Sequence, residues 1–161
     1  MEAEQKAIRS GRRSRKTRLP IGPRVRVMLV RESGPLYSEP LNSSSSVHEL
    51  LKEEMLSLDR ECFLALFLDG RNKLLGIDEI SRGSLGSSIV HPRELFKAAI
   101  LTNAAAVICV HNHPSGDPTP SAEDRRITER IRQAAEILGI PILDHVVLGN
   151  PSYYSFADNG W

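Results

Sequence analysis

The segment spanning residues 107–138 constrains the fold more than any other part of the chain. It opens with the apolar, partly β-branched run 107–110, which is typical of a buried strand. Prolines and a glycine within residues 114–120 predict a stiff turn and exclude a helix until Ser121. Ser121 is a favourable N-cap, and the apolar residues that follow at helical spacing predict a helix to about Leu138. The segment therefore predicts a buried strand, a stiff loop and an amphipathic helix.

Two histidines and one carboxylate occupy the junctions of this segment. His111 and His113 are two positions apart at the end of the strand, so both side chains point to the same face, about 6.5 Å apart along the strand. Asp124 lies in the first turn of the helix, and the intervening turn can bring it back to the two imidazoles. Two nitrogens, one oxygen and a water molecule form the open tetrahedral site of a catalytic zinc ion. The sequence therefore predicts a metal site made of His111, His113 and Asp124.

Each part of this pattern also has an ordinary structural explanation. A pair of histidines separated by one residue is often structural, and Ser121 with Asp124 forms a common capping box. Packing alone, however, does not readily explain two same-face histidines, a stiff turn and a carboxylate at the start of the next helix. The combination of these features therefore favours a metal site over a separate structural explanation for each feature.

The same residues resemble a known family. His111-x-His113, seven further residues and Ser121-x-x-Asp124 resemble the metalloprotease motif of JAMM/MPN domains. Over about residues 24–161 the chain is similar to the RadC family, a bacterial branch associated with DNA repair. The stretches that carry this similarity are residues 90–94, 103–106, 111–116 and 143–145. The resemblance implies an α/β fold with the three-layer JAMM/MPN (cytidine-deaminase-like) arrangement, in which helices flank a central mixed β-sheet.

The resemblance also implies roles for single residues. Glu61, just before the first core strand, takes the place of the JAMM catalytic glutamate and is expected to be the general base. Ser121 takes the place of the serine that donates its hydroxyl to the oxyanion. Asp144 and His145 are candidates to orient a ligand imidazole. Three alternatives stay open: a solvated strand end for Glu61, an ordinary core histidine for His145, and Glu79 as the base.

The rest of the chain predicts alternating strands and helices. The segment 61–69, apolar without interruption between Glu61 and Asp69, predicts a central strand, and the strand 106–110 is its expected neighbour, which brings Glu61 towards the metal. Further strands are expected at residues 24–30, 73–80, 142–149 and 153–156, and further helices at residues 47–58 and from Pro92 to about Asn103. Trp161 is expected to pack against the body of the domain.

The charge is distributed unevenly. The formal net charge of the whole chain is +1. Residues 1–27 hold nine Lys or Arg and two Glu, whereas residues 28–161 hold twelve basic and eighteen acidic residues, a net charge of −6. Residues 1–23 are expected to form a disordered basic tail, and residues 24–161 one domain. The tail is either a solvated segment or an arm that binds the phosphates of nucleic acid. RadC proteins usually carry a helix-hairpin-helix region first; this chain resembles the short form that lacks it.

Composition limits the class of protein. A chain of 161 residues with 40% apolar and 25% charged residues is typical of a soluble globular domain. Neither an apolar run near 18 residues nor a signal-peptide core is present, so no membrane association is expected. Cys62 and Cys109 lie in apolar runs and are expected to be reduced core residues of a cytoplasmic protein. Because neither belongs to a Cys-x-x-Cys, a cysteine-ligated zinc site is excluded.

The expected function is zinc-dependent hydrolysis. One Zn²⁺ per chain would serve JAMM-type cleavage of a peptide or isopeptide bond in an unknown peptide or protein substrate. The alternative is a non-catalytic, metal-stabilised binding module in DNA repair or mobile-element function. Two other enzyme classes are excluded. An HNH nuclease spreads its motif residues over a hairpin and a helix, whereas His111-Asn112-His113 are adjacent. A cytidine deaminase needs His-x-Glu and Pro-Cys-x-x-Cys, which this chain lacks.

Overall fold

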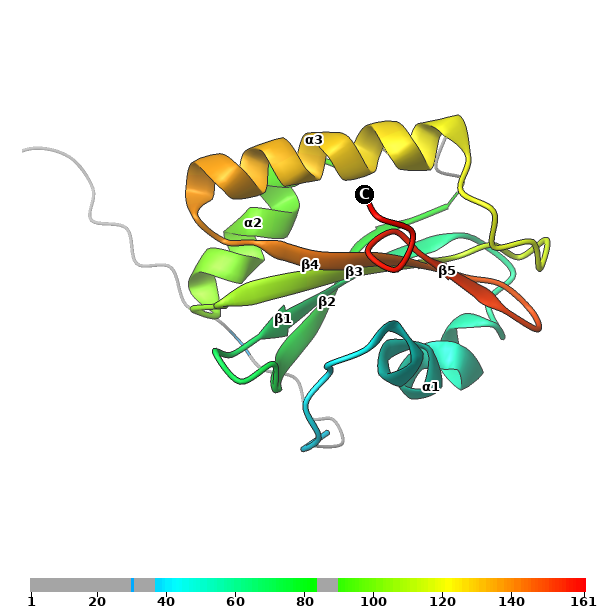
Figure 1. The fold of residues 1–161 in the computed structure, drawn as a ribbon, viewed down its shortest axis with the longest axis horizontal. Helices are drawn as coiled ribbons and strands as arrows, with labels where there is room; N and C mark the ends of the chain where they lie inside the picture. Colours follow the sequence, from blue (N-terminus) through cyan, green and yellow to red (C-terminus); the bar gives the residue numbers. More distant parts are fainter. Residues whose placement is uncertain (1–29, 31–36, 84–89) are drawn as a thin grey trace, which may run out of the picture.

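A five-stranded mixed sheet with helices on both faces forms the body of the protein (Figure 1). The structure is a computed structural model that describes residues 30, 37–83 and 90–161. The basic tail predicted at residues 1–23 and nearly all of the strand predicted at residues 24–30 lie outside the described residues, where only Val30 of that strand is placed. The predicted three-layer α/β arrangement is confirmed.

The elements alternate along the chain much as predicted. The three helices are α1 (Ser44–Met55), α2 (Pro92–Leu101) and α3 (Ala122–Leu138). The five strands are β1 (Cys62–Leu68), β2 (Leu74–Arg82), β3 (Ala106–Asn112), β4 (Ile142–Leu148) and β5 (Tyr153–Ser155). The first helix differs most from its predicted range of 47–58. Ser43 caps it through a capping box, and it ends at Met55, so Leu58 packs from the following turn.

The strands are ordered β2-β1-β3-β4-β5. β1 pairs antiparallel with β2 and with β3, β3 pairs parallel with β4, and β4 pairs antiparallel with β5. The predicted pairing of the strand after Glu61 with the strand before His113 is therefore confirmed. In this pairing Phe63 lies opposite His111. Because β3 has neighbours on both edges, its ends are held in register from both sides.

The alternation of side chains along the central strands divides the core into two layers. On β1, Phe63, Ala65 and Phe67 pack beneath α2 and α3, whereas Leu66 and Leu68 pack against α1. On β3, Val107 and Cys109 face α2 and α3, and Ile108 and Val110 face α1. Continuing this period of two, His111 falls on the α3 face and Asn112 on the α1 face. Both are buried.

The two cysteines lie in these layers. Cys62 packs in the layer under α1 and Cys109 in the layer under α2 and α3, and neither forms a disulfide. Burial raises the pKa of the Cys62 thiol to about 11 and also raises the pKa of Cys109. Both cysteines are therefore buried core residues, as predicted.

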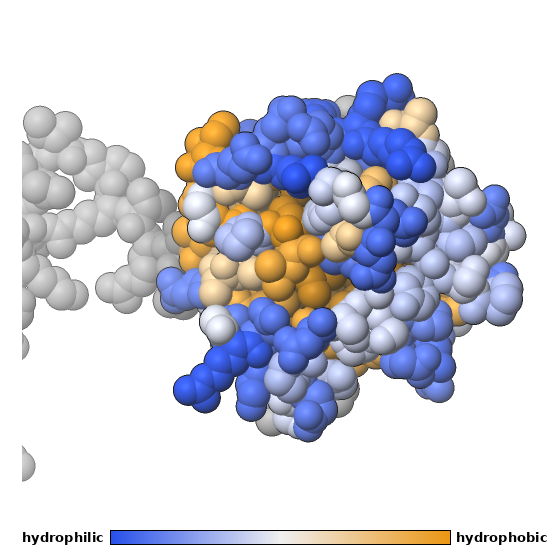
Figure 2. All heavy atoms as spheres, in the orientation of Figure 1, coloured by the Kyte–Doolittle hydropathy of each residue, from blue (hydrophilic) through white to orange (hydrophobic). Residues whose placement is uncertain are grey.

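The surface of α3 is mostly polar, and the C-terminal segment packs against it. Figure 2 shows hydrophilic side chains along this helix and hydrophobic ones at its C-terminal end, where Ile137 and Leu138 are exposed. The guanidinium of Arg132 lies 4.7 Å from the centre of the Trp161 ring. This contact confirms the predicted packing of Trp161 on the domain. Among the described residues, no helix is both long and apolar enough to span a membrane.

The turn between β4 and β5 supports the stiff loop that follows β3. The His113 N–H donates to the Leu148 carbonyl at 2.8 Å, and the Asn150 N–H donates to the Gly116 carbonyl at 2.9 Å. Between these two bonds Gly149 lies against the loop so closely that an added Cβ would be 2.7 Å from Cδ and 2.8 Å from N of Pro118. The loop therefore rests on a position where any side chain would push it away.

Gly149→Ala is expected to destabilise the fold. The added methyl group would overlap the backbone of the loop, and such overpacking costs about 1–3 kcal/mol. Urea denaturation should show a lower unfolding free energy for this variant. Gly70→Ala is the matched control, because an added Cβ there meets nothing within 4 Å. Equal stability of the two variants would mean that the loop moves aside without cost.

Candidate metal centre

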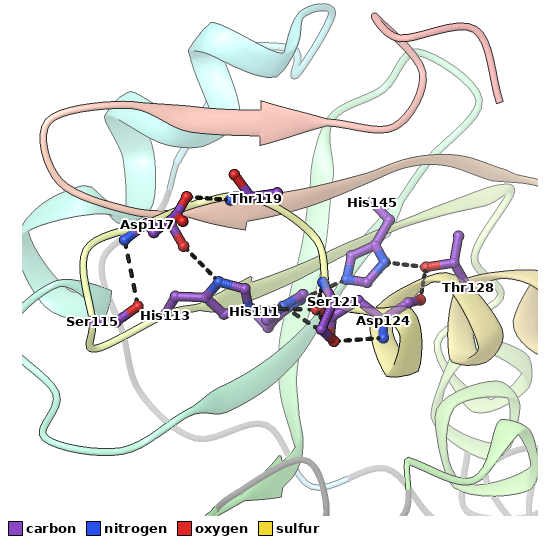
Figure 3. Close-up of polar contacts among 9 residues, drawn as sticks. All are labelled: His111, His113, Ser115, Asp117, Thr119, Ser121, Asp124, Thr128 and His145. Carbon is purple, nitrogen blue, oxygen red and sulfur yellow. Dashed lines mark hydrogen bonds and ion pairs between the residues drawn. The ribbon is translucent and has the colours of Figure 1, made fainter.

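Three side chains from two elements and the loop between them converge beneath the N-terminus of α3. His111 comes from the end of β3, His113 from the first residue after it, and Asp124 from the first turn of α3 (Figure 3). Ser121 has the extended backbone of an N-cap and forms a reciprocal capping box with Asp124. The box sets where the helix begins and thereby directs the carboxylate towards the histidines.

The ligand atoms of these three residues lie close together. His111 Nε2 is 3.1 Å from His113 Nε2 and 3.3 Å from Asp124 Oδ1, and His113 Nε2 is 3.5 Å from Asp124 Oδ2. Each residue offers one ligand atom, and the three ligand atoms lie within 4.8 Å of one another. The side chains of His111 and Asp124 are fully buried, whereas that of His113 is 11% exposed. The cluster is therefore closed on the core side and approachable from the His113 side.

The Asp124 carboxylate has one satisfied and one orphaned oxygen. Oδ2 accepts hydrogen bonds from the Ser121 N–H at 2.7 Å and from the Ser121 hydroxyl at 2.6 Å. Oδ1 is buried, and no donor among the described residues forms a hydrogen bond with it. A buried acceptor without a partner costs about 1–3 kcal/mol, more when it is charged. The orphaned Oδ1 is the position at which a cation would supply the missing interaction.

The neighbours of Asp124 keep its carboxylate charged. Burial opposes ionisation, but the imidazoles of His111 and His113 and the hydroxyl of Ser121 outweigh it and lower the pKa of Asp124 well below its usual range. The same carboxylate raises the pKa of His113, against the effect of burial. Burial lowers the pKa of His111. The cluster therefore presents a negative oxygen beside one fully buried and one partly buried imidazole.

A backbone carbonyl fixes the orientation of the His113 ring. Nδ1 of His113 lies 2.7 Å from the carbonyl oxygen of Asp117, which can only accept. The proton of the neutral ring is therefore on Nδ1, and Nε2 presents its lone pair to the cluster. The Asp117 side chain in turn accepts from the Thr119 N–H at 2.9 Å, which holds this part of the loop (Figure 3).

His145 contacts the other ligand imidazole. Its Nε2 lies 2.8 Å from Nδ1 of His111, and its Nδ1 lies 2.6 Å from the hydroxyl of Thr128. Burial lowers the pKa of His145 well below its usual range, so the ring is neutral. Thr128 was not predicted as a site residue. The sequence feature that could have indicated it is its position, four residues after Asp124 on the same face of α3 and among apolar residues.

Asp144, the neighbour of His145, faces another part of the molecule. Its Oδ1 accepts from the N–H groups of His145 and Ala157 at 2.7 and 2.9 Å, and its Oδ2 accepts from the Ser155 hydroxyl at 2.6 Å. These bonds hold the C-terminal turn against the edge of β4. Of the two predicted orienting residues, His145 contacts a ligand and Asp144 contacts the turn.

Glu61 lies just before β1, on the side of the cluster. The pairing of β1 with β3 ends with Phe63 opposite His111, so Glu61, one residue before β1, lies at the same end of the sheet as the two histidines. Glu61 also acts with Asp124, the larger contributor, to raise the pKa of His113. Glu79, the alternative candidate for the base, pairs with Leu64 in the β1–β2 ladder. The guanidinium of Arg82 donates to its carboxylate at 2.6 and 2.8 Å. That ion pair occupies Glu79 on the neighbouring strand.

Asn112, between the two histidines, holds the backbone on both sides of Glu61. Its Oδ1 accepts from the buried Cys62 N–H at 2.8 Å, and its Nδ2 donates to the Arg60 carbonyl at 3.0 Å. The one strand end thus carries the two imidazoles on one face and, on the other, the amide that fixes the position of Glu61.

The donor set fits a divalent transition-metal ion. Two imidazole nitrogens and one carboxylate oxygen suit zinc and several of its neighbours, and their number leaves room for a further ligand. His111 Nε2 lies 3.1 Å from His113 Nε2 and 3.3 Å from the orphaned Oδ1 of Asp124. The arrangement is that of an acceptor cluster, which a cation stabilises.

Asn112→Ala is expected to destabilise the protein by about 1–3 kcal/mol, because it leaves the buried Cys62 N–H without its acceptor. The unfolding free energy from urea titration measures this. Gln133→Ala removes an exposed amide from α3 and should stay within about 0.5 kcal/mol of the wild type. No difference between the two variants would show that the Asn112 bonds contribute nothing to the strand end.

Comparison with known proteins assigns the chain to one family. A profile of the RadC-like JAB domain matches residues 41–161. A UPF0758 protein of Desulfitobacterium hafniense is 51% identical over 128 residues, 80% of this chain and 56% of that protein. A UPF0758 protein of Geotalea uraniireducens is 52% identical over 122 residues, 76% of this chain and 54% of that protein. The chain spans about half the length of these curated relatives, and it belongs to the RadC-like JAB domain family.

Proposed function

We propose that this domain is a metal-dependent hydrolase that cleaves peptide or isopeptide bonds, with zinc as its ion. One observation carries the proposal: two oriented imidazole nitrogens converge on the orphaned, buried oxygen of an ionised carboxylate. A cation at that point satisfies the carboxylate and both lone pairs together. His111, His113 and Asp124 would hold the ion, leaving the partly exposed side of His113 for water and substrate.

The chemistry divides between the ion and the chain. A bound zinc ion would polarise a substrate carbonyl and make water acidic enough to lose a proton near neutral pH. Glu61, at the same end of the sheet as His111 and His113, is the proposed general base, which takes the proton from water and passes it to the leaving amine. The two bonds from Asn112 hold the backbone of Glu61 while this happens.

Ser121 has two proposed tasks. In the structure its hydroxyl donates to Asp124 Oδ2 at 2.6 Å, which directs the other oxygen, Oδ1, towards the histidines. We propose that during reaction the hydroxyl turns from Asp124 to donate to the tetrahedral oxyanion. Its lone pair keeps accepting from the Asp124 N–H, at 3.1 Å, so that the helix remains capped.

Three parts of the proposal rest on the resemblance to RadC proteins and JAMM enzymes: zinc as the native ion, a peptide or protein as the substrate, and action in DNA repair within the cytoplasm. Nucleic-acid binding by the basic tail, which lies outside the described residues, is a separate proposal.

Metal content tests the proposal directly. Inductively coupled plasma mass spectrometry on protein purified without chelator should find about one zinc per chain in the wild type and in Glu61→Gln, and none in His113→Ala. His48→Ala is the matched control, because His48 belongs to α1, on the face of the sheet opposite α3 (Figure 1), and stacks on Tyr153. It should keep its zinc.

Hydrolysis tests the second half of the proposal. Libraries of peptides and lysine-linked isopeptides, incubated with the zinc-loaded wild type, should yield cleaved products at a rate that falls about 10²–10⁴-fold in Glu61→Gln. A wild-type protein that neither contains zinc nor takes up added zinc would overturn the proposal that this domain is a zinc-dependent hydrolase. Stoichiometric zinc with no cleavage in either library would favour a metal-stabilised binding module.

A further inference from the structure

We propose that Thr128 is a positioning residue that selects the metal-binding tautomer of His111, acting through His145. The inference rests on the proposed metal site and concerns how the chain prepares it. Three consecutive hydrogen bonds connect Asp124, Thr128, His145 and His111 inside the core (Figure 3). The direction of each bond follows from the chemistry of the group at its end.

The first step concerns the Thr128 hydroxyl, which has one proton and two close partners. Its oxygen lies 2.6 Å from the Asp124 carbonyl oxygen and 2.6 Å from His145 Nδ1. A carbonyl can only accept, so the hydroxyl proton points to Asp124. The bond to His145 must then run the other way, with Nδ1–H of His145 donating to the threonine oxygen.

The second step concerns the His145 ring, which is 1% exposed and lies between the rings of Phe63 and Phe156. Its two nitrogens are taken by Thr128 and His111, and neither partner carries a negative charge. A second proton would place an uncompensated charge in the core, so the ring holds one proton, on Nδ1. Its Nε2 is therefore an acceptor.

In the third step, the tautomer of His145 determines the tautomer of His111, the proposed metal ligand. His111 Nδ1 lies 2.8 Å from that acceptor and must donate to it. The single proton of His111 is thus on Nδ1, and Nε2 faces His113 and Asp124 with its lone pair. The opposite tautomer would direct an N–H into the cluster and block a cation. His111 has no backbone carbonyl in the role that Asp117 plays for His113; among the hydrogen bonds of the described residues, His145 takes that role.

A purely structural role explains Thr128 less well. A threonine hydroxyl in a helix commonly bonds to the carbonyl four residues earlier, which accounts for the contact with Asp124 alone. It does not account for the equally short contact with His145 on β4. Thr128 is 4% exposed on a helix face that otherwise buries Ile127, Ile131 and Ala135. Valine would fill the same volume there without a polar atom.

The test compares Thr128→Val, which keeps the shape and removes the hydroxyl, with Thr128→Ser, which keeps the hydroxyl. Zinc affinity, measured in competition with a chromophoric chelator, should fall about 10–100-fold in the valine variant and stay within about threefold in the serine variant. Thermal unfolding of each variant separates this effect from loss of the fold. Thr128→Ala provides a second variant without the hydroxyl if the valine protein does not fold.

Nitrogen-15 spectra of the histidine rings test the tautomers themselves. In the zinc-loaded wild type, His145 should carry its proton on Nδ1 with Nε2 as a hydrogen-bond acceptor, and His111 should be protonated on Nδ1 and coordinated through Nε2. Thr128→Val should shift His145 towards the other tautomer, which a residue that only packs would not do. Thr128→Ser should restore the wild-type pattern.

The outcomes separate the two proposals. A wild type that binds no zinc overturns the proposed function, while the ring spectra of the protein as purified still report whether Thr128 controls the tautomer of His145. A wild type that binds zinc, with equal affinity and unchanged spectra in Thr128→Val, overturns the role of Thr128 and leaves the metal site standing. An Nε2–H signal for His145 in the wild type would also overturn it.

Discussion

The pairing of β3 with β1 on one edge and with β4 on the other is the constraint on which the rest of the site depends. It holds the end of β3 from both sides, with Phe63 opposite His111 on one side and Val147 level with it on the other. Side-chain alternation then sends His111 towards α3 and Asn112 towards α1. A shift of one residue in either pairing would exchange these two directions and remove the site.

A chain of polar groups crosses an otherwise apolar core because each of its members has a partner. The Asp124 carbonyl, Thr128, His145 and His111 form one continuous path, and the capping box of Ser121 satisfies Asp124 Oδ2. Within the described residues, the chain leaves one buried side-chain acceptor without a hydrogen bond, Asp124 Oδ1. Because buried polar groups are normally paired, the exception marks where the protein is incomplete without a ligand.

Local patterns in the sequence were sufficient for the parts of the site that depend on local geometry. The spacing of His111 and His113 predicted a shared face, Ser121 predicted the start of α3 and, through the cap, the position of Asp124. The apolar run of β1 predicted a central strand. Each of these follows from periodicity or capping within a few residues. The end of α1 was predicted less well, because Leu58 continues the apolar spacing although the helix stops at Met55.

The remaining features depend on contacts between distant segments, and no local pattern contains them. Parallel pairing of Cys109 with His145 brings His145 near the level of His111, and that register is not visible in either strand alone. Asn112 is likewise distant in sequence from its partners beside Glu61, 50 residues from Cys62 and 52 from Arg60. Asp144 and His145 were predicted as a pair, but neighbouring residues on a strand point to opposite sides, and they serve different parts of the structure.

The central claim is that His111, His113 and Asp124 hold one divalent ion and leave a position open to water. Zinc K-edge X-ray absorption of the zinc-loaded full chain tests it most directly. The zinc ion should have two imidazole nitrogens at about 2.0–2.1 Å, oxygen ligands at about 2.0–2.2 Å and four ligands in all. His113→Ala, which lacks one of the two imidazoles, should lose the bound ion. A sulfur ligand at about 2.3 Å, or fewer than two imidazoles in the wild type, would contradict the account.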